Sequence, residues 1–187
     1  MSEAETPSKD EASEEEIPEE SEIIEFPSPE LLHGVPVSHS RGQVVLHPSR
    51  DEYVALVASL REIGYWICVD LCGVDYLGFG PQRNLPAGIA EERFEVVVGL
   101  LNHGERSRVR LRVQVPESEA MISTLFHLHP STENPEREVF DMFGIRFEGH
   151  PDMTRILMPD EWIGHPLRKD YELGSIPVQF KGASTTR

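Results

Sequence analysis

The sequence predicts an α+β domain in which helices cover a small mixed or antiparallel sheet. Three observations support this fold class. Two neighbouring segments alternate apolar and polar residues, residues 51–63 carry apolar residues at helical spacing, and 187 residues that are 39% hydrophobic suffice for one core. We divide the chain into a disordered acidic tail (residues 1–25), a core domain (26–130), and a helix with an extended partner-binding arm (131–187).

Most of the negative charge lies in the tail. The chain carries a formal charge of −16, and residues 1–25 hold eleven acidic side chains against Lys9 alone. Few apolar residues and a run of like charges predict disorder, either as a solvated tail or as a docking segment for a basic partner. The tail has neither the basic start and apolar stretch of a secretory signal nor the acid-poor composition of a transit peptide.

The composition also limits the partners that we expect. No stretch of eighteen apolar residues is available to span a bilayer, so we expect a cytoplasmic chain unless a partner holds it at a membrane. A phosphate backbone requires a basic face, and the acidic balance therefore argues against nucleic acid.

The first half of the core domain predicts a strand, a helix and a second strand. Prolines and glycines punctuate residues 26–48, where Val44–Leu46 is the only clear strand candidate. Residues 51–63 place Tyr53, Leu56, Val57, Leu60 and Ile63 on one helical face, and the helix should end at Gly64. A strand follows over residues 65–71. The Gly- and Pro-rich residues 78–92 predict a loop, without the lysine that a phosphate-binding loop needs.

A hairpin follows that loop. Apolar residues alternate over 94–100 and 109–115, with a turn at Asn102-His103-Gly104 between them. Arg108, Arg110 and Arg112 then share the other face, which is either a solvated face or one that receives acidic segments of a partner. Residues 117–128 carry Met121, Ile122, Leu125 and Phe126 at helical spacing, and we expect a helix there.

Residues 133–171 predict a short helix followed by extended chain. Asn134 can cap the helix, Pro135 suits its first position, Glu136 and Glu138 favour the positive end of its dipole, and Gly144 stops it. Arg137 and Asp141 are four residues apart and can form an ion pair. Residues 145–147 predict a strand, and prolines keep the following arm extended.

Other residues offer chemistry that the pattern does not complete. Cys68 and Cys72 lie about 13 Å apart on the expected strand, which is too far for a disulfide, so we expect buried structural thiols. His127 and His129 could ligate a metal with a distant carboxylate. His150 or His165 with Glu138 or Asp141 could form an acid–base pair, but no nucleophile or pocket is evident. We therefore assign no catalytic, cofactor-binding or metal-binding residue.

Charged and apolar side chains after residue 133 instead favour a protein interface. Charge-assisted contacts can hold the arm in register, and Trp162, Phe143 and Leu167 are candidate apolar anchors for a partner. The alternative is that the charges pair within the domain. The candidate interface residues are Glu136, Arg137, Glu138, Asp141, Phe143, His150, Arg155, Trp162, His165, Leu167, Arg168, Lys169 and Asp170.

Several sequence blocks resemble the C subunit of respiratory NADH-quinone oxidoreductase, complex I. They are EREVFDMFG at 136–144, GHPD at 149–152, RILMP at 155–159 and GHPLRKDY at 164–171, with weaker likeness at 70–76 and 94–101. Three departures from the family pattern stand out: Asn134-Pro135 replaces an aromatic residue, Thr154 a basic residue and Glu172 a common proline. The core of the pattern is intact.

The resemblance implies a structural subunit of the peripheral arm of complex I. Such a subunit binds no flavin or iron–sulfur cluster itself; FMN and the clusters belong to partner subunits. It braces the quinone-site subunit and neighbouring iron–sulfur subunits on the cytoplasmic side of the cell membrane, and so supports NADH-to-quinone electron transfer and proton translocation. Two alternatives are an equivalent subunit of a membrane-bound hydrogenase or formate hydrogenlyase, and a free-standing acid–base hydrolase.

Overall fold

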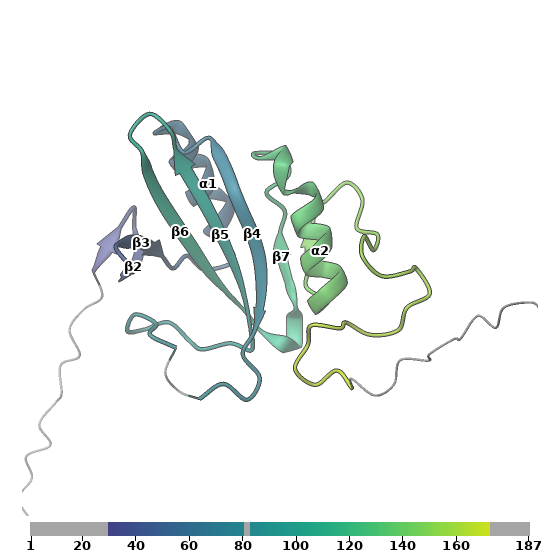
Figure 1. Cartoon of the computed structure of the whole chain (residues 1–187). Helices are drawn as coiled ribbons and strands as arrows, with labels where there is room; N and C mark the ends of the chain where they lie inside the picture. Colours follow the sequence, from purple (N-terminus) through teal and green to yellow (C-terminus); the bar gives the residue numbers. More distant parts are fainter. Residues whose placement is uncertain (1–29, 81–82, 173–187) are drawn as a thin grey trace, which may run out of the picture.

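Six strands form one mixed sheet, and two further strands form a second, small sheet (Figure 1). The computed structural model describes residues 30–80 and 83–172, so the expected disorder of residues 1–25 lies outside the described residues. The order in the large sheet is β1-β2-β3-β6-β5-β4, with β3 and β6 parallel and the other pairs antiparallel. The predicted α+β class is confirmed.

The elements follow one another without an internal repeat. The strands are β1 (Leu31–Leu32), β2 (Val35–Ser40), β3 (Gln43–Leu46), β4 (Ile67–Asp75), β5 (Phe94–Asn102), β6 (Ser107–Val115), β7 (Met121–Ser123) and β8 (Arg146–Glu148). The helices are α1 (Tyr53–Glu62), α2 (Glu133–Phe143) and the short 3-10 turns η1 (Glu117–Glu119) and η2 (Pro130–Thr132).

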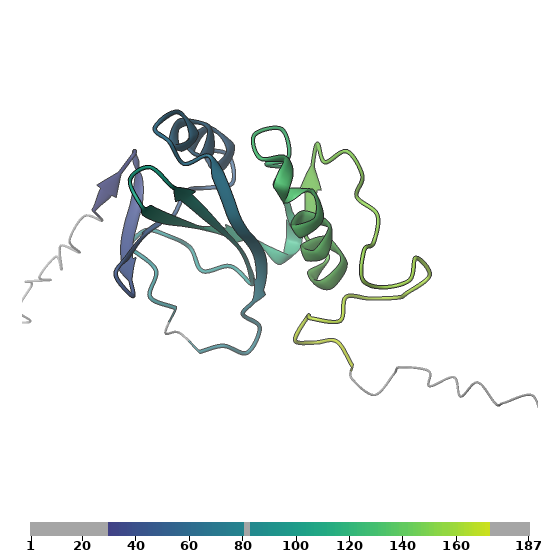
Figure 2. The ribbon, with the colours of Figure 1, turned by 45° about the horizontal axis from the view of Figure 1, so that its top comes forward.

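The β5–β6 hairpin forms the centre of the sheet, as its alternating pattern predicts. Val98 pairs with Leu111, and both are fully buried on the face that α1 covers. The apolar stripe of α1 packs there, with Tyr53 and Val57 also fully buried. Figure 2 shows α1 lying over one side of the strands. The opposite face carries the arginines of β6, as the period of two requires.

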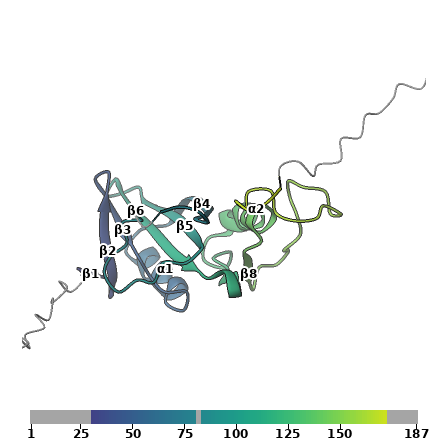
Figure 3. The same ribbon diagram turned by 90° about the horizontal axis from the view of Figure 1, so that it is seen from below.

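Helix α2 packs beside β4, the strand at one edge of the large sheet. Seen from below, α2 and β8 lie at one end of the molecule and β1 and β2 at the other (Figure 3). Gly73 of β4 allows α2 to approach closely, because an added Cβ would lie 2.8 Å from Phe143 and 3.0 Å from Val139. Val139 belongs to the same buried cluster as the hairpin. The division of the chain at residue 130 stays a prediction.

The predicted helix over residues 117–128 is wrong. A 3-10 turn at Glu117–Glu119 leads into β7, which pairs in parallel with β8 through Ile122 and Phe147. The apolar residues at helical spacing therefore serve a short strand and the loop after it, since pairing with a distant segment overrides a local pattern.

Smaller boundaries also differ from the prediction. The helix α2 begins at Glu133, so Asn134 lies inside its first turn, and no side chain caps it. Residues 26–48 form more strand than predicted. Their prolines and glycines do not prevent β2, which includes Pro36, and Pro36 pairs with Leu31 of the edge strand. The strand expected over 65–71 runs to Asp75. The stop at Gly144 is confirmed, with φ at 76° in the left-handed region.

We predict that Gly73→Ala lowers the free energy of unfolding by about 1–3 kcal/mol, because the new Cβ would displace Phe143 and Val139 and separate α2 from β4. The matched control is Gly104→Ala, whose Cβ would meet Asn102 at an ordinary 3.4 Å. Urea unfolding monitored by circular dichroism measures both. Equal stability of the two variants would contradict the close packing of α2 on β4.

Candidate partner interface: the C-terminal arm and its anchors

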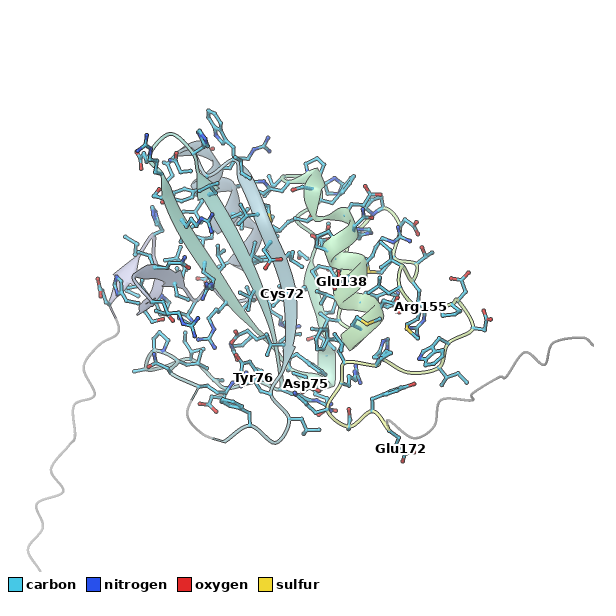
Figure 4. The ribbon with its side chains drawn as sticks, viewed as in Figure 1. Cys72, Asp75, Tyr76, Glu138, Arg155 and Glu172 are labelled. Atoms are coloured by element: carbon cyan, nitrogen blue, oxygen red, sulfur yellow. The ribbon has the colours of Figure 1, made fainter. Side chains whose placement is uncertain are left out.

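A buried carboxylate at the end of α2 holds the C-terminal arm, defined here as residues 149–172. Asp141 Oδ2 accepts hydrogen bonds from three successive backbone N–H groups, those of Ile156 at 3.1 Å and of Leu157 and Met158 at 2.8 Å. Its other oxygen accepts from Arg155 Nη1 at 2.5 Å. Figure 4 shows Arg155 on the arm beside α2. This cluster is the first anchor.

The first anchor requires Asp141 to be ionised. Its side chain is fully buried, and burial alone would raise the pKa of the carboxyl group. The backbone N–H groups of residues 156–158 and the Arg155 guanidinium outweigh that effect and hold the pKa below its usual range. Arg155 also donates to Gly164 O at 2.9 Å, which brings the later part of the arm against the earlier part.

The arm also satisfies the carbonyl groups at the C-terminus of α2. A helix leaves its last carbonyls without partners inside the helix. Here His165 Nδ1 lies 3.0 Å from Asp141 O. Leu167 N donates to Met142 O at 3.0 Å, and Arg168 Nε donates to Phe143 O at 2.6 Å. Gly144 makes this approach possible, since an added Cβ would lie 2.6 Å from His165 Nε2 and 2.7 Å from Arg168 Nη2.

The outer side of α2 holds the start of the arm. Arg137 donates to Thr154 Oγ1 at 2.9 Å and to the carbonyls of Thr154 and Arg155 at 3.1 Å. His150 Nε2 lies 3.0 Å from Glu133 O. These contacts lie nearer the N-terminus of α2 than the first anchor, so the arm is in contact with both ends of the helix.

A second anchor ties the end of the arm to the large sheet. Asp75, at the end of β4, accepts two hydrogen bonds from Arg93 at 3.1 and 3.0 Å and one from Lys169 N at 2.8 Å. Arg93 in turn contacts Asp170 at 2.6 Å and Glu117 at 2.5 Å. Burial opposes ionisation of Asp75, but these donors leave its pKa below the usual range.

A third buried carboxylate fixes α2 itself. Glu136 is fully buried, and it accepts from Thr124 Oγ1 at 2.5 Å and from Leu125 N at 2.8 Å. Burial raises the pKa of Glu136, although the hydrogen bonds from Thr124 and Leu125 oppose that shift. This contact joins α2 to the segment after β7. The helix that carries Asp141 is therefore held in place by buried hydrogen bonds to Thr124 and Leu125.

The outer side of the arm is apolar in several places. Ile163 is 91% exposed, Leu157 59% and Leu167 52%. Trp162 is half-buried, and its Nε1 has no hydrogen-bond partner among the described residues. Large exposed apolar side chains on a segment whose backbone is held in place are typical of a surface that another protein covers.

The structure brings six of the thirteen predicted interface residues together in the two anchors and the helix cap. Asp141, Arg155, His165 and Arg168 form the first anchor and the helix cap, while Lys169 and Asp170 join the second anchor through a backbone N–H and a carboxylate. Of the others, Arg137 and His150 join α2 to the start of the arm, and Trp162 and Leu167 lie on the arm itself. Glu136 is buried beneath α2, Phe143 packs on β4, and Glu138 is exposed on the helix. Whether a partner contacts any of them stays a prediction.

One predicted pairing is wrong. Arg137 does not pair with Asp141, although the two lie four residues apart on α2. Asp141 instead pairs with Arg155 of the arm, and Arg137 binds Thr154. The reason is that the arm supplies better-placed groups to both side chains than the helix surface does.

The second anchor was not predicted. Asp75 and Phe94 nevertheless lie in the two upstream blocks with weaker family likeness, which was the available signal. Arg168 and Arg93 both lie over the Phe94 ring, at 5.1 and 4.8 Å from its centroid. The two blocks therefore meet the end of the arm in the folded chain.

The cysteines and the neighbouring pair His127 and His129 lie outside the anchors. Cys68 is half-buried, and burial raises its pKa to about 11. Cys72 is exposed, which contradicts the expectation of two buried thiols, because its side chain points to the face without a helix. His127 is exposed and His129 buried. Within residues 30–80 and 83–172, no three His, Cys, Asp or Glu side chains cluster as metal ligands.

No helix within the described part of the chain has the length and apolar character needed to cross a bilayer.

Comparison with known proteins supports the resemblance. Residues 46–176 match the family described as respiratory-chain NADH dehydrogenase, 30 Kd subunit. The NADH-quinone oxidoreductase C subunit of Roseiflexus castenholzii is 44% identical over 76% of this chain and 78% of its own length. The protein of the same name from Herpetosiphon aurantiacus is 42% identical over 78% and 81%. That from Saccharopolyspora erythraea is 39% identical over 79% of this chain, which spans only 56% of that relative.

Two solved structures share the fold. A trypsin-resistant fragment of Nqo5 aligns with a TM-score of 0.57 and 34% identity, covering 64% of this chain and 89% of the fragment. A chain in an archaeal membrane-bound sulfane sulfur reductase complex aligns with a TM-score of 0.60 over 82% of this chain and 90% of its own length. Its 21% identity shows similarity of fold alone.

We predict that Asp141→Asn releases the middle of the arm, because an amide offers one acceptor oxygen in place of two and no charge for Arg155. The free energy of local opening at the amides of Ile156, Leu157 and Met158 should fall by roughly 2–4 kcal/mol. Hydrogen exchange measures it. The control is Asp160→Asn, an exposed residue of the same arm, and unchanged protection in the Asp141 variant would contradict the first anchor.

The anchors also predict a dependence on pH. The pKa values of Asp141 and Asp75 are lower in the folded state than in the unfolded chain, so their contribution is complete above about pH 4 and is lost as the pH falls through the folded values. Carbon NMR of the two carboxyl groups should give midpoints below about 3.9, the ordinary value of a free aspartate. Midpoints at or above the usual value would show that burial outweighs the hydrogen bonds.

Proposed function

Because this chain belongs to the family of the 30-kDa subunit of respiratory-chain NADH dehydrogenase, we propose a role for it in complex I. In this role it acts as a non-catalytic structural subunit of the peripheral arm. Its relatives are named as C subunits of NADH-quinone oxidoreductase. We propose that the chain assembles with the quinone-site subunit and with neighbouring iron–sulfur subunits, and supports electron transfer from NADH to quinone by bracing them.

The main support for this role is the construction of the C-terminal arm. Its backbone and charged groups are bound to α2 and β4, while Leu157, Ile163 and Leu167 face outward. A segment already ordered before binding loses less conformational entropy on association. The outward aliphatic side chains would enter apolar sites on a neighbouring subunit, and the anchors would resist any displacement of that subunit.

In this role the redox chemistry belongs to the partners. FMN and the iron–sulfur clusters would be bound by other subunits, and this chain would contribute a rigid surface. It would be held at the cytoplasmic side of the cell membrane by its contacts with them, as a peripheral component of a proton-translocating complex.

We predict that Leu157→Asp/Ile163→Asp prevents assembly while the isolated chain keeps its fold. Two carboxylates would be buried without partners in the assembled complex, so the amount of intact complex should fall by roughly tenfold or more. Native electrophoresis of membranes that express the tagged variant measures the amount, and NADH:quinone reductase activity measures the consequence.

The matched control is Leu31→Asp/Leu32→Asp, which introduces the same charges at exposed positions of β1, at the opposite end of the molecule. This control should assemble normally. Normal assembly of the arm variant would remove the arm from the interface. Normal assembly with lost reductase activity would point to a direct part in the chemistry and contradict a purely structural role.

A further inference from the structure

The face of the large sheet opposite α1 has no helix over it among the described residues. On this face Val97 pairs with Arg112, Gly99 with Arg110 and Leu101 with Arg108. Cys72 of β4 lies on the same face, opposite Val97 (Figure 4). The face therefore combines an apolar strip on β5 with a row of three arginines on β6, which we call the arginine face.

Two adjoining hollows mark the arginine face. One, of about 160 Å³, lies over Gly99 and is lined by Val69, Asp70, Arg108 and Arg110. The other, of about 230 Å³, is lined by residues that include Val74, Tyr76, Glu95, Arg110 and Arg112. The hollows share Val97 and Arg110, so a ligand that fills both must bring apolar groups to the floor and negative charge to the rim.

The charges of the arginine face are only partly neutralised. Arg112 is paired with Glu95 at 2.7 Å, and Arg110 reaches only the amide of Gln43 at 3.0 Å. Within the described part of the chain, no carboxylate lies in an ion pair with Arg108 or Arg110. Asp70 lines the first hollow and Glu95 the second, so two carboxylates oppose the three arginines and the site keeps a net positive charge.

The N-terminal segment of this same chain has the matching composition. Residues 19–26 read EESEIIEF, which contains four glutamates together with Ile23, Ile24 and Phe26. In an extended segment, successive side chains alternate sides, so part of the apolar set can face the sheet while glutamates reach its rim.

The point where this segment joins the sheet places it within reach. Glu30 O accepts from Val37 N, Val37 pairs with Leu46, and Leu46 pairs with Leu111, which lies between Arg110 and Arg112. Glu30, the first described residue, thus lies at the level of these arginines and three strands away from them, or about 14 Å at about 4.8 Å per strand. Four residues of extended chain span about 13 Å.

We propose that residues 19–26 of the chain bind the arginine face, with their glutamates beside Arg108 and Arg110 and their apolar side chains in the two hollows. The chain would thus cover its own exposed sheet face, and a partner with an acidic segment would have to displace it. This inference rests on the sheet and the N-terminal segment alone and is independent of the role proposed for the arm.

The test uses the full chain with Cys68→Ala, Cys72→Ser and Ser21→Cys, carrying a nitroxide at position 21. At about 0.01 M salt, where the Debye length is about 30 Å, the amide NMR signals of Val97, Gly99 and Arg110 should lose more than half their intensity relative to the reduced label. At about 1 M salt, where screening acts within about 3 Å, the intensity should largely return.

Two charge-matched variants decide the site. Arg108→Glu/Arg110→Glu should restore the three signals at low salt, whereas Arg61→Glu/Arg146→Glu, which makes the same charge change at exposed positions away from the arginine face, should not. The dispersion of the remaining amide signals verifies that each variant is folded. No broadening in the parent chain, equal effects of both variants, or broadening centred on the arm at Leu157 and Ile163 would each overturn the proposal.

Discussion

The structure of the C-terminal third depends on one buried carboxylate. Asp141 leaves water completely and remains ionised only because three backbone N–H groups and the Arg155 guanidinium surround it. Removing one member of such a set leaves a buried charge without compensation, which costs several kcal/mol. Helix α2 and residues 155–158 must therefore be ordered together. The helix in turn depends on Glu136, whose contacts with Thr124 and Leu125 join it to the rest of the fold.

This constraint explains how an arm without regular secondary structure can be ordered. Ordering a backbone costs roughly 1–2 kcal/mol per residue in conformational entropy, and the arm has no ladder of its own to offset it. It uses groups that the core leaves unsatisfied instead: the last carbonyls of α2 and the carboxylate of Asp75 at the end of β4. Arg155, His165 and Arg168 of the arm bind the core, while Leu157, Ile163 and Leu167 remain outside. The proposed structural role requires this arrangement.

Local sequence patterns predicted the helices and strands whose formation depends on residues close together in the sequence. The β5–β6 hairpin, α1 and the stop of α2 at Gly144 follow from alternation, helical spacing and a left-handed glycine. The β7 strand could not be found, because its pairing with β8 joins residues about twenty-five positions apart and Met121 and Ile122 fit either period. The charged residues of the site were identified, but their partners were not: Asp141 and Arg137 suit a helix-surface pair, and only the tertiary structure shows that the arm reaches Asp141 first. No periodicity or spacing marked Asp75 and Arg93 as partners, and only the weak family likeness at residues 70–76 and 94–101 pointed to the region of the second anchor.

The C-terminal arm is held by its own chain and, in the role proposed here, covered by another. An electron cryo-microscopy structure of the assembled complex that contains this chain tests both parts at once. We expect that Asp141 still binds the backbone of residues 156–158 and that Leu157, Ile163 and Leu167 are buried against a neighbouring subunit. An arm detached from α2 in the assembly, or an arm in place with these three side chains facing water, would contradict this expectation.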